Sequence, residues 1–411
     1  MSTPAQVPSP SPLASVPFRW LFGGQIVSTV GSQLSPMVIV ALIVPGSDQP
    51  ALTMGVVMGA RFAALALFIV LGGVLADRVD RFKLLACTDV LSIAALGPII
   101  VMGEATPLAV VSASSFVLGA SDALFAPTYD AAVTSVVGPD QLARANALTK
   151  AVRGVAKVLG PPLAGLVVVL VGVSGTVILD AITFGVSFVT LGRLVLLELG
   201  RPAVAASESM ARAAIGGVRA MLRLRWLTAL EVMAMVHVLL AVAPWVVLLP
   251  VVADRRLGGI ESYGMLLGAF AAGAIPGALL GARVRVRLRG LVVLGGLMPF
   301  GVCCIALAST TEPWVLVVAF FVAGTGTELT DIVKTTEIQL QVPGDVLGRV
   351  FALDFFASFV TMPLGQLLTG LVVAPGSERT ALLFAGMLIL VTTPLVALVP
   401  GVATLGDRAP P

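Results

Sequence analysis

The stretch "IVLGGVLADRVDRFKLLAC" (69–87) separates two apolar segments by a short, dense group of charges. Five of the seven residues from Asp77 to Lys83 are charged, whereas residues 51–76 contain a single charged side chain, Arg61. Apolar sequence resumes directly after Lys83. Because charged groups are costly inside hydrocarbon, the pattern predicts two membrane-spanning helices joined by a polar turn at the membrane surface.

The composition of the whole chain favours the same interpretation. Of its 411 residues, 58% are hydrophobic and 11% are charged, whereas a soluble domain carries about 25% charged residues. The basic residues recur at short breaks between apolar runs and form no patch, which argues against a nucleic-acid-binding protein. The three cysteines and one histidine have no metal-site spacing, so neither a metal nor a cofactor is expected.

Apolar runs long enough to cross a bilayer, about 20 residues each, recur along the chain. Cutting at polar or Pro/Gly breaks gives twelve runs, at 18–44, 51–76, 84–102, 107–137, 145–171, 174–197, 226–252, 261–282, 291–310, 313–341, 349–374 and 379–402. We therefore predict an all-α membrane protein with twelve transmembrane helices. Alternate breaks are rich in Lys and Arg, which places them and both termini in the cytoplasm and the protein in the inner cell membrane.

The second half of the chain repeats the first. Segments 140–168 and 345–373 align at an offset of 205 residues, matching Gly160 with Gly365 and Gly165 with Gly370. A weaker echo links "TMGVVMGA" (53–60) with "SYGMLLGA" (262–269), each with two glycines four residues apart. Such spacing lets helices approach closely. Two similar six-helix bundles around a midplane site are the architecture of an alternating-access transporter.

This repeat divides the chain into five parts. They are a disordered cytoplasmic tail (1–17), an N-terminal six-helix bundle (18–197), a cytoplasmic linker with an amphipathic helix (198–225), a C-terminal six-helix bundle (226–402) and a second cytoplasmic tail (403–411).

The polar turn resembles the signature between helices 2 and 3 of the major facilitator superfamily. The matching residues are Gly73, Asp77, Arg78, Arg81 and Lys83, and Asp80 stands where glycine is usual. The resemblance covers nearly the whole chain and implies two pseudo-symmetric six-helix bundles. "DQLARANAL", "LDAITF" and "PLGQLLTG" resemble the branch of bacterial exporters that includes enterobactin-exporter-like and macrolide-efflux-like proteins.

A second motif, "LGPPLAG" (159–165), resembles the helix-5 motif of the superfamily's antiporters through Gly160, Pro161 and Gly165. The resemblance also implies a latch, in which Asp77 faces the N-terminus of helix 11, near Gly348 and Arg349, where the helix dipole favours a negative charge. The arginines of the signature would then reach acids on neighbouring helices, with Asp130 and Asp354 as candidates. The alternative is that these basic residues only fix the topology.

Ionisable residues inside apolar runs cost free energy to place in the membrane, so each is a candidate functional residue. From their depth, at about 1.5 Å per residue, we expect Asp122 to pair with Lys157 and Arg153 to meet Asp130. Arg61 has no obvious partner at its depth. The alternative is that these pairs are purely structural.

The tenth apolar run carries four charged residues at spacings of three: Glu328, Asp331, Lys334 and Glu337. Successive members are neighbours on a row that winds around the helix. Asp331 and Lys334 are expected to neutralise each other. Glu328 lies close to the midplane and is the first candidate for proton coupling, followed by Asp331 and Asp122. The alternative is a self-contained ladder of salt bridges.

Helices 1, 4, 7 and 10 line the cavity in the family that the chain resembles. Candidate cavity residues on the corresponding runs are Gln25, Thr29, Gln33, Tyr129, His237 and Trp245. For each of them, packing is the alternative to substrate contact.

These features predict a secondary active transporter that exports small amphipathic molecules, such as drugs, macrolides or siderophore-like compounds, by alternating access with proton antiport. It is expected to act as a monomer in the lipid bilayer. The alternatives are a lipid or lysolipid flippase or an importer on the same fold, or a transport-incompetent membrane sensor. No nucleotide-binding loop or catalytic motif is present in the sequence, so an enzyme is not expected.

Overall fold

The computed structural model describes residues 11–45, 47–197, 222, 224–283, 288–342, 350 and 361–405. These residues form helices and no strand, which confirms the all-α prediction. In chain order the elements are η1 (Pro12–Ala14), α1 (Val16–Gly31), α2 (Leu34–Ile43), α3 (Pro50–Arg78), α4 (Arg81–Met102), η2 (Gly103–Ala105), α5 (Leu108–Val136), α6 (Pro139–Leu196), α8 (Arg225–His237), η3 (Val238–Val242), α9 (Ala243–Arg256), α10 (Ile260–Arg283), α11 (Arg289–Ser309), α12 (Pro313–Gln341) and α14 (Glu378–Val396).

Within the described residues, ten helical segments are long and apolar enough to cross a membrane. One of them, Asp140–Leu196, has 57 residues, far more than the roughly 20 that one crossing needs. Gly172 interrupts it with a φ of 72°, in the left-handed region that glycine adopts readily. The kink falls between the two runs expected at 145–171 and 174–197. The first part of the run expected at 349–374 lies mostly outside the described residues, although 361–372 are helical, so the count of twelve stays a prediction.

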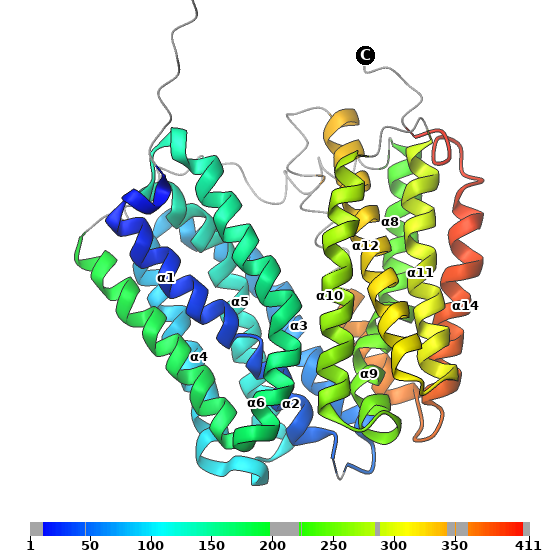
Figure 1. Cartoon of the computed structure of the whole chain (residues 1–411), viewed down its shortest axis with the longest axis horizontal. Coiled ribbons are helices and arrows are strands. Elements are labelled where there is room, and N and C mark those ends of the chain that lie inside the picture. Colours follow the sequence, from blue (N-terminus) through cyan, green and yellow to red (C-terminus); the bar gives the residue numbers. More distant parts are fainter. Residues whose placement is uncertain are drawn as a thin grey trace, which may run out of the picture.

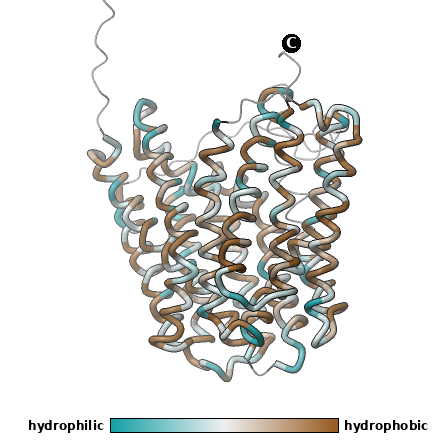
Figure 2. Tube along the Cα trace, turned by 45° about the vertical axis from the view of Figure 1, so that its right-hand side comes forward, coloured by the Kyte–Doolittle hydropathy of each residue, from teal (hydrophilic) through white to brown (hydrophobic). Residues whose placement is uncertain are grey.

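The surface of the bundle is apolar along its length. Figure 2 shows hydrophobic residues over most of the helices and hydrophilic ones gathered at the connecting turns. Large side chains such as Leu170, Leu371 and Val101 are 70%, 72% and 86% exposed. Such a surface suits lipid rather than water, which confirms a multi-pass membrane protein.

One membrane-spanning segment contains a π-helical turn. α8 and α9 are joined by η3, at which the Ala243 amide donates to the Val238 carbonyl, five residues back. Pro244 follows directly and has no amide hydrogen to donate, so the regular α-helical ladder cannot continue through it. His237 lies at the start of this turn.

The helices gather in two groups, α1 to α6 and α8 to α14, and the start of α1 and the end of α14, the helices nearest the chain ends, lie on the same side (Figure 1). Away from the chain ends, a single buried cluster joins side chains of both groups, including Met54, Ala164, Trp245 and Tyr263. Toward the chain ends, each group has its own cluster: one is centred on Phe18, Phe82 and Tyr129, and the other on Trp226, Val293 and Val402. The two groups are therefore packed together at one end of the bundle and separated at the other.

Glycines make these contacts between the groups possible. A methyl group at Gly55 of α3 would clash with the Gln366 carbonyl oxygen, and one at Gly59 would lie 3.1 Å from Leu367. A methyl group at Gly264 of α10 would lie 2.6 Å from the Pro161 carbonyl oxygen of α6. The two glycine pairs that echo each other in sequence thus each pack against a helix of the opposite group.

Candidate functional site

A polar pocket of about 490 Å³ opens within the first group of helices. Its lining comes from α1, α3, α4, α5 and α6 and the turn after α1; the polar residues are Gln25, Ser28, Thr29, Ser32, Gln33, Thr88, Asp89, Ser92, Ser121, Asp122, Arg153 and Lys157. Gln25 donates a hydrogen bond to Thr29 one turn along α1. Three of the six expected cavity residues, Gln25, Thr29 and Gln33, therefore share this pocket.

Asp122 pairs with Arg61, and not with Lys157 as the sequence suggested. Arg61 Nη2 of α3 lies 2.8 Å from Asp122 Oδ2 of α5. The reason is the close approach of the two helices at Gly119, where a methyl group would clash with the Arg61 carbonyl oxygen. Asp122 lies three residues further along α5, within reach of the guanidinium group. Arg61 thus has a partner that depth alone did not reveal.

Arg153 lies between an acid and an aromatic ring. Its Nη1 is 3.5 Å from Asp130 Oδ1, the neighbour expected from the sequence. Its guanidinium carbon is 5.1 Å from the centre of the Tyr129 ring, within the range of a cation–π contact. Tyr129 is buried beneath Arg153 rather than in the lining of the pocket.

Two buried acids were missed in the sequence. Asp89 of α4 is 2% exposed and lines the pocket, and Asp180 of α6 is fully buried and accepts a hydrogen bond from Ser35. Both were visible as single acids within apolar runs, the same signal that singled out Asp122.

The charged row of α12 connects to other helices. Lys334 Nζ lies 3.2 Å from Glu231 Oε1 of α8, and Glu337 Oε1 lies 2.6 Å from Arg289 Nη1 of α11. The row is therefore not a self-contained ladder, because its winding path turns successive members toward different neighbours.

Glu328 is half-buried on α12 and feels the charges of two residues, the exposed Asp331 on its own helix and Lys157 on α6. Lys157 also lines the polar pocket. The structure therefore brings the first proton-coupling candidate toward a cation of the opposite helix group.

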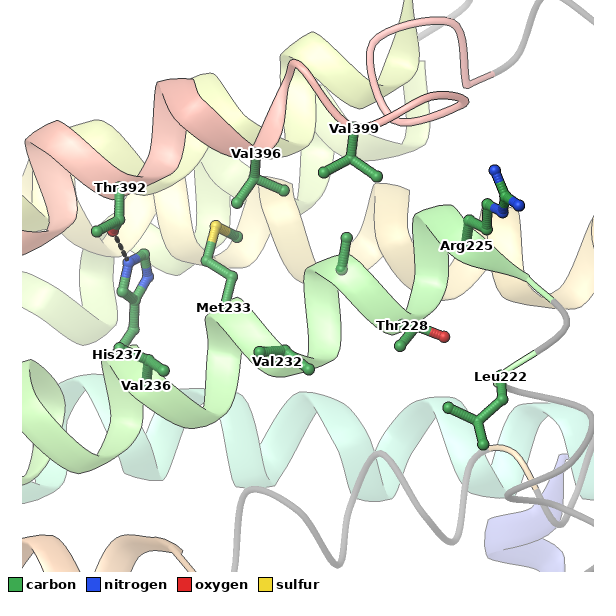
Figure 3. A pocket seen from close by; sticks show the side chains of 11 residues that line it. Leu222, Arg225, Thr228, Val232, Met233, Val236, His237, Thr392, Val396 and Val399 are labelled. Carbon is green, nitrogen blue, oxygen red and sulfur yellow. Dashed lines mark hydrogen bonds between the residues drawn. The ribbon is translucent and has the colours of Figure 1, made fainter.

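His237 and Trp245 lie away from the polar pocket. His237 Nε2 is 2.7 Å from Thr392 Oγ1, at one end of a mostly apolar cavity of about 540 Å³ between α8 and α14, with Arg225 at the other end (Figure 3). Trp245 is buried in an aromatic cluster, with its ring centre 5.3–5.6 Å from those of Phe270, Phe300 and Phe320. Trp245 is therefore part of the core, and His237 is a hydrogen-bonded wall of a separate cavity.

The polar turn after α3 is built by local contacts. Asp80 caps α4, because its carboxylate accepts hydrogen bonds from the amides of Phe82 (2.9 Å) and Lys83 (3.1 Å). This capping accounts for an acid where the family usually has glycine. Arg81 donates to the Ala131 carbonyl at 3.2 Å and to Ser135 Oγ at 2.9 Å.

Arg81 therefore binds neutral groups at the end of α5, and not Asp130, which pairs with Arg153. Lys83 is exposed. The side chains of Gly73, Asp77 and Arg78, and the expected latch partners Gly348, Arg349 and Asp354, lie outside the described part of the chain, as does nearly all of the expected linker 198–225.

The helix-5 motif lies at a junction of three elements. A methyl group at Gly160 would clash with the side chain of Gln33, and one at Gly165 would lie 3.2 Å from the Ile260 carbonyl oxygen. Pro161 presents its carbonyl to Gly264 of α10. The motif thus contacts both the wall of the pocket and the opposite helix group. Over the residues that the structure describes, no three His, Cys, Asp or Glu side chains group as a metal site would require.

Comparison with known proteins places these features in context. The sequence profile of a family described as transmembrane secretion effector matches residues 8–404. Over 399 residues the chain is 27% identical to the enterobactin exporter EntS of Shigella flexneri, covering 92% of each protein. It is 22% identical over 362 residues to macrolide efflux protein A of Streptococcus pyogenes, covering 86% of this chain and 88% of that protein.

A crystal structure of a peptide transporter, POT, in complex with alafosfalin has a fold similar to that of this chain. The TM-score is 0.73 at 14% sequence identity, and the superposition covers 94% of this chain and 95% of the other. At this identity the likeness shows a shared fold.

Proposed function

Because the chain belongs to the major facilitator superfamily, in the family of transmembrane secretion effectors, it is a membrane transporter and not an enzyme, and we propose that it exports small amphipathic molecules by alternating access, driven by inward proton flow. The relatives that export enterobactin and macrolides support export as the direction. We place the protein in the inner cell membrane as a monomer, with both termini in the cytoplasm.

The observation that carries the proposal is the polar pocket of about 490 Å³ inside an otherwise apolar helix group. Ionisable groups within a membrane are costly and mark substrate or proton paths. Four charged residues line the pocket: Asp89, Asp122, Arg153 and Lys157. Ligand pockets of 300–1,000 Å³ suit drug-sized molecules, so both the size and the chemistry fit a small molecule with polar and apolar parts.

The packing of the two helix groups supports alternating access. They share one core at the end away from the termini and have separate cores at the end near the termini. With cytoplasmic termini, this arrangement is open to the cytoplasm and closed to the outside. Rocking about the glycine contacts would exchange the open and closed ends.

For proton coupling we propose Glu328 first, then Asp331 and Asp122. Glu328 is half-buried, and Lys157 of the opposite helix group acts on it electrostatically. Protonation of Glu328 would remove its attraction for Lys157. A proton taken up at this position would thereby alter the balance between the two groups of helices.

The test measures export from proteoliposomes across an imposed pH gradient, with and without an uncoupler. Wild-type protein is expected to move a cationic or zwitterionic amphiphile against its gradient. Glu328→Gln is expected to lose at least tenfold in gradient-driven rate while keeping substrate exchange without a gradient. The matched control is Glu312→Gln, an exposed acid at the start of the same helix. Full gradient-driven transport by Glu328→Gln would contradict the assignment.

A second candidate function is movement of a lysolipid or lipid. The cavity between α8 and α14 favours it, because its lining is mostly apolar and Arg225 lies at one end, where it suits an anionic headgroup (Figure 3). The same proteoliposomes loaded with a fluorescent anionic lysolipid distinguish the two functions. Accumulation of the lysolipid in the opposite leaflet without export of the soluble amphiphile would favour the lipid function.

A further inference from the structure

The polar pocket contains one carboxylate, that of Asp89, which takes part in no ion pair among the described residues. Asp89 lines the pocket from α4 and is 2% exposed. Ser187 of α6 serves it as a hydrogen-bond partner, but its Oδ2 atom is buried with no hydrogen-bond partner. Among the described residues, no Lys, Arg or His lies within ion-pair distance of Asp89.

Most of the other charges around the pocket already have partners. Asp122 pairs with Arg61, and Arg153 pairs with Asp130. Lys157 lies within electrostatic range of Glu328 and forms no ion pair with a described residue. Asp180 accepts from Ser35 and lies within electrostatic range of Arg61 and Asp122. A charged Asp89 therefore has no ion-pair partner among the described residues, which is unfavourable at membrane depth.

Two further buried atoms of the same lining have no partner. Gln25 Oε1 and Ser121 Oγ are buried without a hydrogen bond, and both residues line the pocket together with Asp89. Buried polar atoms are usually hydrogen-bonded, so these two oxygens retain the capacity to bind a polar group. Like Asp89 Oδ2, both atoms can accept a hydrogen bond, and such acceptors are the chemistry that recognises a positively charged group with N–H donors.

We propose that Asp89 is the cation-recognition residue of this pocket, where its carboxylate binds either a proton or the ammonium-type group of a cationic substrate. The two occupants exclude each other. When the ammonium group enters, the carboxyl proton of Asp89 leaves to water on the open side, and when the substrate departs Asp89 takes up a proton again. The inference rests on the proposed export function and specifies its substrate class as cationic amphiphiles.

The test uses the purified full-length protein in nanodiscs, in weakly buffered solution near neutral pH, with octylammonium as the probe and octanol as its neutral match. Octylammonium is expected to bind with stoichiometric release of protons, and octanol with none. Asp89→Asn is expected to bind octylammonium roughly 10- to 100-fold more weakly, the loss of a hydrogen bond to a charged group, and to release no proton. Asp254→Asn, an exposed acid near the end of α9, is the matched control.

A second measurement covers the case in which Asp89→Asn does not fold. Infrared difference spectra of the wild type are expected to show a protonated carboxyl band that disappears when octylammonium binds. Proton release by a folded Asp89→Asn protein, a band that persists with bound probe, or failure of octylammonium to bind would each overturn the inference. Neither measurement depends on transport. If the protein exports nothing but releases protons in an Asp89-dependent way, the proposed export is wrong and the cation site is supported.

Discussion

At the scale of single residues, some charges have tertiary partners that depth along the helices did not suggest. Arg61 is held by Asp122, and Lys334 by Glu231 on another helix. Glu231 is the most enclosed member of these pairs, at 2% exposed. Removing one partner of such a pair leaves the other charge buried without compensation. The pairs are therefore expected to matter for stability as well as for transport.

Glu231→Gln tests this expectation. Loss of the carboxylate 3.2 Å from Lys334 is expected to destabilise the protein by about 3 kcal/mol, seen as a decrease of several degrees in the apparent Tm in detergent. Glu231→Gln combined with Lys334→Met should recover part of the loss, because the second substitution removes the charge that Glu231 compensated. Glu261→Gln, an exposed acid at the start of α10, is the control. An unchanged Tm for Glu231→Gln would show that the pair is dispensable.

At the scale of the helices, small residues decide where the two groups meet. The glycines of α3 lie against residues 363–370, and those of α10 lie against Val158 to Pro162 of α6. Val158 to Pro162 overlap the helix-5 motif, and residues 363–370 overlap the repeat of this motif in the second half of the chain. The duplication in sequence is thus reproduced as two equivalent contacts, both at the end away from the termini.

Gly55→Val is expected to open this end. Overpacking costs about 1–3 kcal/mol, which shifts the balance between the two states by about 5- to 150-fold. Spin labels at residues 48 and 379, on opposite sides of the contact, should move apart and transport should slow. Gly97→Val on α4, where a methyl group has nothing within 4 Å, is the matched control. Equal distances between the labels in both variants would show that this contact has no role in the conformational change.

At the scale of the whole molecule, the continuous core at one end and the separate cores at the other indicate one state of a two-state transporter. Which state it is depends on the orientation in the membrane. From the alternate breaks rich in Lys and Arg, we expect the termini, and with them the separated ends of the helix groups, on the cytoplasmic side.

Cysteine labelling of intact cells tests this orientation. In a background without the native cysteines, an impermeant maleimide is expected to label cysteine at exposed residues 48 and 261 but not at exposed residues 13 and 288. Permeabilised cells should show labelling at all four positions, which controls for reactivity. Labelling of residue 13 in intact cells would reverse the orientation and make this arrangement open to the outside.

The sequence by itself determined that the chain lies in a membrane, where most of its helices run and to which family it belongs, because these follow from apolar length, charge content and local motifs. The Arg153–Asp130 pair was predicted in the same way, since it depends on position along helices whose order is known. The coupling role of Glu328 stays a prediction. Asp89 carried the same signal and was overlooked.

Only the tertiary structure decided which charges meet and which end is closed. The pairing of Arg61 with Asp122 depends on the rotation of α3 and α5 and on their close approach at Gly119. The unsatisfied oxygens of Asp89 and Gln25 appear only once all neighbouring helices are in place. Contacts between helices depend on how segments far apart in the sequence pack together, and the pattern within a single helix does not specify its neighbours.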